Sequence, residues 1–295
     1  MILSQTTACA SKFGDEEAIR LIAQAGFDAV DFDMSNLRNE KGILLSPDYQ
    51  KYITALCDEA KRNNVFFNQG HALGSFRHPD REVARRVLVE RNIRALEIAG
   101  LMGIKTLVIH PIGTGDYIGN EQCFFEENLK YFQSLLPYAY KHGVKLACEN
   151  MWCVDKKKGV RLGSVCSNPY EHAYYVDAVA DPMLVACLDV GHSSLSGREA
   201  QDCIRVLGKR LGALHIHDND YLDDMHTLPG LSEMNWDEIT KALAEIEYEG
   251  DFTLETDSFF DSLCTVEETQ CGLKLAELIG RKLIYNIEQY KSAGK

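Results

Sequence analysis

Carboxylate side chains stand directly after short apolar runs at three places in this 295-residue sequence. Glu149 follows KLAC, Asp189 follows LVACL and Glu255 follows FTL. A carboxylate that is buried behind such a run costs free energy unless a cation or a hydrogen-bond donor compensates its charge. Carboxylates and imidazoles are also the ligands of divalent metal ions of borderline to hard character. These residues therefore predict a site for a divalent metal ion.

Histidines accompany the carboxylates at or just beyond the ends of the apolar runs. Taken singly, such a histidine is more often a hydrogen-bonded structural residue than a metal ligand. Their recurrence at successive runs is what indicates a shared site, to which the motif DMH adds one more acid and one more histidine. The candidates are His71, His110, His192, His215, His217, Asp224 and His226.

Two of these histidines compete for one role. His215 and His217 are two positions apart in HIHDND, so on a strand both side chains share a face. We predict His217 as the metal ligand because it is nearer the carboxyl end of the expected strand. The remaining histidines fall in expected loops and helices, where a structural or solvated role is the better interpretation; they are His78, His142 and His172.

Eight strand-like runs alternate with amphipathic stretches that are long enough to be helices. The runs start at Met1, Phe27, Asn64, Ile104, Val144, Met183, Leu211 and Gly250. Several helices are expected to end on a left-handed glycine just before the next strand; these glycines are Gly26, Gly103, Gly143 and Gly250. Runs such as TLVIH are nearly continuous in apolar residues, as is typical of parallel strands that are covered on both faces. The pattern predicts a (β/α)8 TIM barrel formed by residues 1–295 as a single domain.

The first strand-to-helix turn argues against the competing architecture, a doubly wound open sheet. Its sequence, SQTTACASKFGDEE, lacks the glycine-rich dinucleotide fingerprint of that fold. In a closed barrel the carboxyl ends of all strands meet at one rim, where catalytic residues are found. The predicted barrel therefore brings the carboxylates and histidines together.

Composition narrows the class of protein and its partners. Lys plus Arg number 31 and Asp plus Glu number 44, so the formal net charge is −13. This charge disfavours nucleic acid as a partner, since phosphate binding needs a basic surface. No run of 18 apolar residues and no secretory leader is readable, which predicts a cytoplasmic protein with no membrane partner. The ten cysteines show no CxxC spacing and are expected to be reduced thiols.

Five short motifs together resemble the xylose-isomerase-like TIM-barrel superfamily. They are ENMW, CLDVGH, HIHDND, DMHTLPG and LETD. This superfamily includes ketose 3-epimerases, inosose-type isomerases and dehydratases, and endonuclease IV. In the epimerase branch the resemblance implies one Mn, Mg, Co or Zn ion held by Glu149, Asp189, His217 and Glu255. It also implies that His192 contacts a substrate hydroxyl.

The endonuclease branch offers a second interpretation of the same residues. There three zinc ions use additional ligands, and this sequence has counterparts at His71, His110, His192, Asp224 and His226. The net charge of −13 and the lack of interleaved basic and aromatic residues stand against DNA as the substrate. The epimerase branch usually carries an arginine shortly after the strand-seven histidine, whereas HDNDYLDDMH has none. A free-ketose epimerase is therefore not a complete match either.

The leading hypothesis is a metal-dependent isomerase or epimerase of a sugar, sugar phosphate or cyclitol. It would abstract a proton next to a carbonyl and pass through an enediolate, with Glu149 and Glu255 as ligands and acid or base groups. The expected substrate contacts are His71, His110, His192 and Trp152. The alternatives are a metal-dependent lyase or hydrolase of the same superfamily and a multi-zinc phosphodiesterase.

Two further features bear on the partners of the chain. The basic run KKKGVR, from Lys156 to Arg161, is either a solvated loop or a holder of a substrate phosphate or carboxylate. The expected partner is a small-molecule carbohydrate. Assembly into a homo-oligomer stays open, because subunit contacts cannot be read from the motifs.

Overall fold

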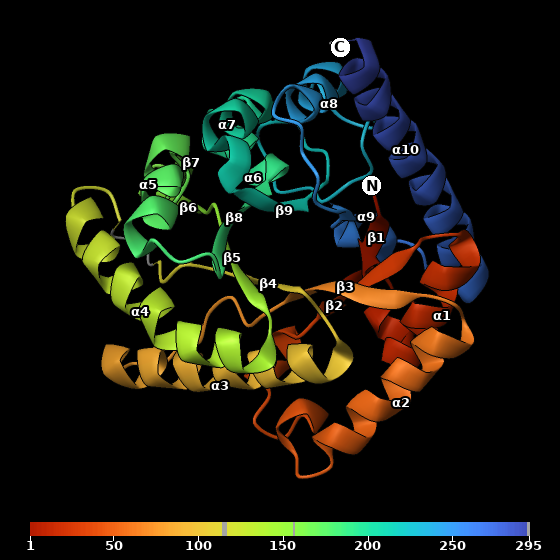
Figure 1. The fold of residues 1–295 in the computed structure, drawn as a ribbon, viewed down its shortest axis with the longest axis horizontal. Coiled ribbons are helices and arrows are strands. Elements are labelled where there is room, and N and C mark those ends of the chain that lie inside the picture. The colour runs from red at the N-terminus through yellow and green to blue at the C-terminus, as the bar shows by residue number, and fades with distance from the viewer. Residues whose placement is uncertain (114–116, 156, 294–295) are drawn as a thin grey trace.

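Eight parallel strands form a barrel at the centre of the molecule, as the alternating pattern predicted (Figure 1). The structure is a computed structural model that describes residues 1–113, 117–155 and 157–293. In barrel order the strands are β10 (Phe252–Leu254), β1 (Leu3–Thr6), β2 (Ala29–Asp33), β3 (Phe66–His71), β4 (Thr106–Ile109), β5 (Lys145–Glu149), β8 (Leu184–Asp189) and β9 (Leu211–His215). The barrel closes between β9 and β10, where Ile216 N donates to Thr253 O at 2.9 Å and Glu255 N donates to Ile216 O at 3.0 Å.

Helices surround the barrel and cover the outer faces of its strands (Figure 1). The α-helices are α1 (Asp15–Ala25), α2 (Tyr49–Arg62), α3 (Arg81–Met102), α4 (Glu121–His142), α5 (Pro169–Val179), α6 (Val190–Leu195), α7 (Ala200–Leu207), α8 (Trp236–Glu245), α9 (Asp257–Asp261) and α10 (Val266–Ala293). Four 3-10 helices add η1 (Thr7–Phe13), η2 (Ser35–Arg38), η3 (Ile43–Leu45) and η4 (Gly208–Arg210) to the described residues.

Three of the four predicted glycine caps are present. Gly26, Gly103 and Gly143 close their helices with φ between 67° and 104°, in the left-handed region that favours glycine. The prediction for Gly250 was wrong, because α8 already ends at Glu245. There the left-handed residue is Glu247, with φ of 54°.

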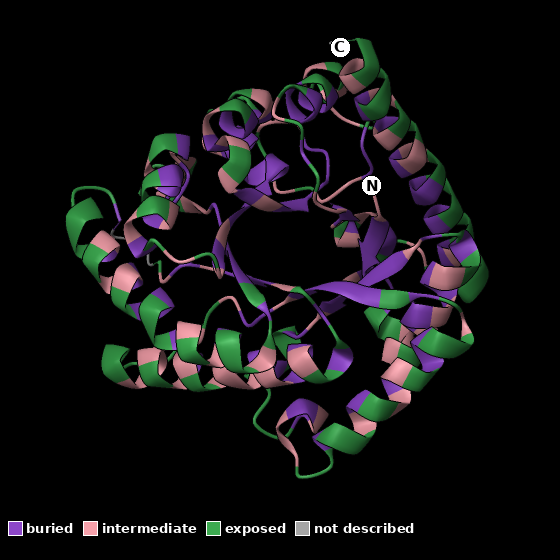
Figure 2. Ribbon diagram, viewed as in Figure 1, coloured by how far each residue is buried: buried purple, intermediate pink, exposed green. Residues whose placement is uncertain are grey.

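Burial follows the barrel closely, since the strands are buried and the outer helix faces are exposed (Figure 2). Small buried residues form a separate inner cluster; they are Val108, Ala147, Cys187 and Ala213. The barrel interior also holds buried polar groups, among which Ser4 donates to Thr253 at 2.9 Å and Asn68 donates to Ser4 at 3.1 Å. The inner cluster is small and apolar, and the rest of the barrel interior is polar. Charged side chains can therefore be accommodated at the mouth of the barrel.

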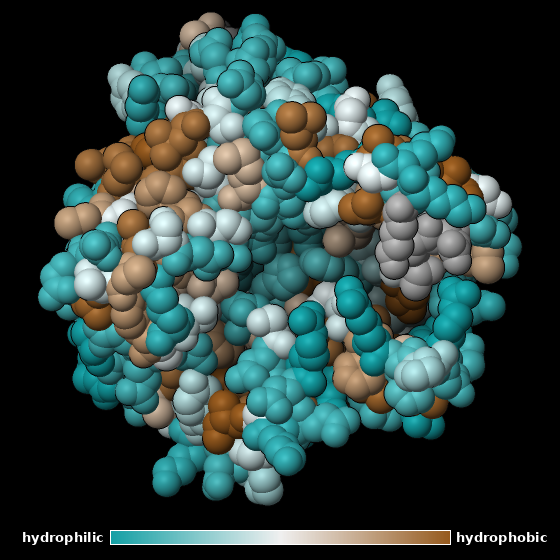
Figure 3. All heavy atoms as spheres, turned by 180° about the vertical axis from the view of Figure 1, so that it is seen from behind, coloured by the Kyte–Doolittle hydropathy of each residue, from teal (hydrophilic) through white to brown (hydrophobic). Residues whose placement is uncertain are grey.

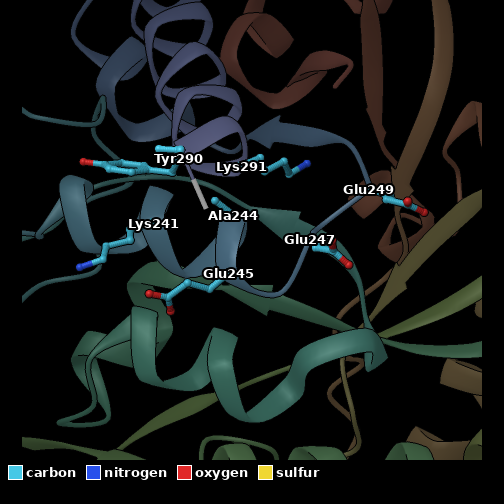
Figure 4. A pocket seen from close by; sticks show the side chains of 8 residues that line it. Lys241, Ala244, Glu245, Glu247, Glu249, Tyr290 and Lys291 are labelled. Atoms are coloured by element: carbon cyan, nitrogen blue, oxygen red, sulfur yellow. The ribbon is translucent and has the colours of Figure 1, made fainter. Parts of the chain in front are cut away.

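Two features of the fold were not expected from the sequence. The strands β6 (Trp152–Asp155) and β7 (Val160–Gly163) form an antiparallel hairpin after β5. A hollow of about 770 Å³ lies between α8 and α10, lined by Lys241, Glu245, Tyr290 and neighbouring residues (Figure 4). It borders the segment that enters β10, so it lies at the amino ends of the strands, away from the predicted chemistry. Within the described ranges, none of the helices combines the length and apolar character that a membrane crossing requires.

Candidate metal centre

The predicted carboxylates stand where the barrel strands end. Glu149 is the last residue of β5, Asp189 is the last residue of β8, and Glu255 directly follows β10. Parallel strands expose their carboxyl ends at a single rim, so three distant parts of the sequence meet there. Seen from behind, the centre of the molecule is a hollow lined by hydrophilic atoms (Figure 3).

Glu149 is the hub of this centre. Its side chain is only 1% exposed, and its Oε2 lies 2.9 Å from His110 Nε2 and 3.5 Å from His71 Nε2. Its Oε1 lies 3.2 Å from His215 Nδ1 and 3.5 Å from His192 Nδ1. One buried carboxylate thus contacts four imidazoles that come from β3, from the ends of β4 and β9, and from α6.

His215 and His217 both point into the barrel and both are fully buried. His217, the predicted ligand, places its Nε2 2.9 and 3.1 Å from the two oxygens of Asp189. The Nδ1 of His215 lies between the glutamates, 3.2 Å from Glu149 and 3.1 Å from Glu255. Both histidines therefore occupy ligand-like positions, at neighbouring places in the centre.

The motif DMH contributes the outer side of the centre. Asp224 lies 3.3 Å from His226 Nε2 and 3.5 Å from His192 Nε2. The ring of His226 stacks on that of His217 with centroids 4.0 Å apart, and its Nδ1 is 3.0 Å from Asp257. Trp152, at the start of β6, donates its indole N–H to Asp224 at 3.1 Å. Asp257 was not a candidate in the sequence analysis.

The donor atoms fit divalent metal ions. Ligand atoms of several groups lie within 4.8 Å of one another, including the groups His71, His110 and Glu149 and, separately, His192, Asp224 and His226. Glu149 Oε2 and Asp224 Oδ1 are buried, and the nitrogens nearest to them are those of His110, at 2.9 Å, and of His226, at 3.3 Å. Two imidazoles beside one carboxylate form the donor set that zinc and manganese accept. The residues present can therefore hold one divalent ion or more.

The pKa shifts in the centre show that its buried carboxylates are stabilised by nearby positive charge. Burial acts to raise the pKa of Glu149, but His110 and His215 hold this pKa well below its ordinary value. Burial alone would lower the pKa of His192, yet Asp189, Asp224 and Glu149 raise it to about 10. Protonated imidazoles thus balance the carboxylates of the chain, and bound cations would take their place.

Asp31 is a buried acid of the centre that the sequence analysis missed. It is fully buried on β2, and its Oδ2 lies 3.9 Å from His215 Nε2, the nitrogen that faces away from the glutamates. Gln69 donates to the same oxygen at 3.4 Å. At 3.9 Å, Asp31 acts on His215 through its charge, which favours the protonated ring, rather than through a hydrogen bond. The signal was present, since Asp31 is a charged residue inside the apolar run AVDF.

Gly191 is the position where the smallest substitution should disturb the centre most. A Cβ at this residue of α6 would lie 2.0 Å from His217 Cε1, so the ring would have to move. We expect Gly191→Ala to weaken metal binding on the order of tenfold or more and to cost about 1–3 kcal/mol of unfolding free energy. Metal titration and thermal unfolding measure the two effects. Gly113→Ala is the control, because its new methyl has only ordinary contacts at 3.6 Å and beyond; equal metal affinity in both variants would contradict the expectation.

The basic run KKKGVR lies partly outside the described residues, because Lys156 is not among them. Arg161 forms an ion pair with Asp223 and lies over the Trp152 ring, 5.3 Å from its centroid. Its guanidinium is therefore occupied at the rim. Holding a substrate anion with this run stays a prediction.

Two adjoining cavities open onto the centre. One, of about 250 Å³, is lined by Asp33, Arg38, His71, His110, Glu255 and Asp257, among others. The other, of about 230 Å³, is lined by His110, Met151, Trp152 and Ser164, among others. Gly74, Ser75 and His110 border both cavities. A ligand in either cavity would lie beside His110 and close to Glu149.

A barrel with a polar centre at the carboxyl ends of its strands defines the class, and sequence comparison defines the family. The family model of the xylose isomerase-like TIM barrel matches residues 19–268, so the chain belongs to this family. The uncharacterized protein MJ1311 of Methanocaldococcus jannaschii is 27% identical over 241 residues, which are 80% of this chain and 78% of that protein. The uncharacterized protein y4fM of Sinorhizobium fredii is 27% identical over 164 residues, 55% of this chain, and the match spans only half of that relative.

Solved structures share the fold at low sequence identity. A D-tagatose 3-epimerase-like protein superposes with a TM-score of 0.70 and 22% identity, covering 96% of this chain and 99% of that one. The IOLI protein with a bound zinc atom superposes with a TM-score of 0.73 and 18% identity, covering 98% of this chain and 99% of that one. The 3-keto-D-glucoside 4-epimerase YcjR of E. coli superposes with a TM-score of 0.72 and 14% identity, covering 94% of this chain and 99% of that one.

Proposed function

We propose that the protein is a metal-dependent isomerase or epimerase of a sugar, sugar phosphate or cyclitol. The observation that carries the proposal is the placement of Glu149 and Glu255 around one nitrogen of His215, at 3.2 and 3.1 Å from its Nδ1. Two carboxylates at one barrel mouth can serve both faces of a substrate carbon. The epimerases among the structural neighbours support the same class of reaction.

The two glutamates differ in their readiness to carry a proton. The pKa of Glu149 is held well below its ordinary value, so it is ionised and can accept a proton. Burial raises the pKa of Glu255 to about 7, where a carboxyl group can both hold and release a proton near neutral pH. We propose that Glu149 removes the proton next to the carbonyl and that Glu255 returns one to the opposite face.

The other residues orient the substrate and the metal. A bound divalent ion would supply the polarisation of the carbonyl and hydroxyl oxygens that makes the neighbouring C–H acidic. In this proposal it is held by Glu149, Asp189, His217 and Glu255. His71, His110 and His192 would orient substrate hydroxyls, and Trp152 would form a wall of the cavity.

The two central histidines can be separated by their effect on metal affinity. We expect His217→Asn to lower the affinity for Mn²⁺ or Zn²⁺ by roughly a hundredfold, since it removes a ligand, and His215→Asn to lower it roughly tenfold or less, since it removes a neighbour. Titration of the metal-free proteins measures both constants. The reverse order would transfer the ligand role to His215.

The function is tested by proton exchange in deuterated water. Metal-loaded protein is incubated with ketoses, ketose phosphates and inososes, and the loss of one carbon-bound proton is followed by NMR. We expect exchange that disappears on chelation and in Glu149→Gln, which lacks the proposed base. Full metal content without exchange on any of these compounds would overturn the proposal.

A multi-zinc phosphodiesterase is the second candidate, and a specific observation favours it. Two separate ligand sets lie at the same mouth of the barrel. One consists of His71, His110 and Glu149, and the other of His192, Asp224 and His226. Two or three ions so placed would clamp a phosphodiester. Elemental analysis that finds three zinc ions, together with hydrolysis of bis(4-nitrophenyl) phosphate, would favour this function over isomerisation.

A further inference from the structure

The cavity of about 250 Å³ at the barrel mouth contains an arginine that has no partner. Arg38 is the one arginine or lysine among the described residues that line it. Its side chain is exposed and makes no hydrogen bond or ion pair with any residue in the described ranges. On the same face Arg161 is paired with Asp223, whereas Arg38 lines the cavity without such a pair.

The turn after β2 holds Arg38 in this place. Asp33 accepts hydrogen bonds from Ser35 N at 2.8 Å and from Ser35 Oγ at 2.7 Å. These bonds start η2, and its Leu37 is fully buried, which anchors the turn against the core. Arg38 is the last residue of η2 and lies over the cavity while the rest of the turn is fixed.

The acidic residues that line the cavity contact other partners, and within the described ranges none of them forms an ion pair with Arg38. The Asp33 carboxylate is taken up by Ser35, and Glu255 and Asp257 lie 3.8 and 3.0 Å from His226 Nδ1. In a chain of net charge −13, an unpaired guanidinium in the wall of a candidate active site selects for an anion. Its planar fork of donors matches a phosphate or a carboxylate.

The size of the cavity limits what that anion is attached to. A volume of about 250 Å³ is at or below the small end of ligand sites, which span roughly 300–1,000 Å³. It is large enough for a group the size of a monosaccharide. His71, His110 and Glu255 line the same cavity, so a ligand that reaches Arg38 also reaches the metal centre.

We propose that Arg38 binds a terminal anionic group of the substrate, a phosphate monoester or a carboxylate, while the reacting carbonyl lies between Glu149 and Glu255. This inference rests on the proposed isomerase or epimerase function and narrows its substrate class. Arg38 is a specificity-determining residue, and the neutral ketose is the poorer substrate.

The test compares three substrates on the metal-loaded protein: a free ketohexose, its 6-phosphate and the corresponding ketohexuronate. We expect the wild type to favour a charged substrate in kcat/KM, and Arg38→Met to reduce the ratio of charged to neutral by roughly 10- to 100-fold, mainly through KM. Arg38→Lys should recover part of the ratio. The matched control is Arg86→Met, an exposed arginine on α3, which should leave the ratio as it is. The better of the two charged substrates identifies the anion.

A binding experiment keeps this inference separate from the proposed reaction. Inorganic phosphate and glycerol 3-phosphate are titrated calorimetrically into metal-loaded wild type, Arg38→Met and Arg86→Met. At least fivefold weaker binding in Arg38→Met alone supports the anion site, even if no ketose is turned over. Equal affinity in all three proteins, or an unchanged substrate ratio in Arg38→Met, overturns it.

Discussion

Replacing Glu149 with Gln is expected to lower turnover by about a thousandfold and to weaken metal binding at the same time. The change keeps the shape of the side chain but removes the negative charge that four imidazoles face at 2.9–3.5 Å. The loss combines a missing proton acceptor, typically worth 10²–10⁴-fold in rate, with a missing metal ligand. Turnover in saturating metal, metal content and thermal unfolding measure the three consequences.

A buried glutamate outside the centre supplies the matched control. Glu277 on α10 is 7% exposed and pairs with Lys274 at 2.7 Å and Arg281 at 3.1 Å. Glu277→Gln also removes a buried charge from an ion-pair network, so it should reduce stability but not turnover. If Glu149→Gln retained turnover within tenfold of the wild type, Glu149 would be neither the base nor an essential ligand.

The barrel could be predicted because each strand-helix repeat has a recognisable pattern in its own stretch of sequence. The cores of TLVIH and LVACLD are nearly continuous in apolar residues, as is typical of parallel strands such as β4 and β8, and a left-handed glycine closes α1, α3 and α4 before the next strand. Such signals depend on neighbours in the sequence and survive without knowledge of the fold. Membership of the xylose isomerase-like family confirms the resemblance that five short motifs indicated.

The end of β8 shows where local patterns stop being informative. The strand that starts near Met183 was expected to end at Asp189, and β8 does end there, but the helix α6 that begins at once was not part of that expectation. Asp189 caps that helix by accepting from His192 N at 2.7 Å, and its carboxylate also contacts His217. One residue thus ends a strand, caps a helix and contacts a histidine of the proposed metal site, and only the three-dimensional structure shows all three contacts together.

The depth of a side chain inside a barrel is equally hidden from the sequence. His215 and His217 share a face, as their spacing predicts, but only barrel closure decides that His215 lies between the two glutamates. Asp31 reaches His215 from β2, and Arg38 enters the mouth from the turn that follows the same strand. The missing arginine after β9 was readable, whereas an arginine supplied from another part of the rim was not.

The metal-free protein is expected to lose stability as the pH rises from about 6.5 to 10. Burial lowers the pKa of His215, but Glu255 and Glu149 raise it to about 9, and the pKa of His192 is about 10. Against an unfolded value near 6.5, the folded chain binds more protons, so this stabilisation is complete below pH 6.5 and is lost as the pH passes the folded values. For His215 alone the loss is on the order of 3 kcal/mol.

Bound metal should abolish this alkaline loss, because the cation replaces the protons that the imidazoles carry. We expect the thermal midpoint of the metal-free protein to fall by roughly 5–10 °C between pH 6.5 and 9.5, and that of the metal-loaded protein to change little. His215→Gln should flatten the metal-free curve, whereas His78→Gln, an exposed loop histidine, should not. If the thermal midpoints of the metal-free and metal-loaded forms changed in parallel with pH, the imidazoles of the centre would not exchange protons for metal. That result would contradict the proposed ligand set.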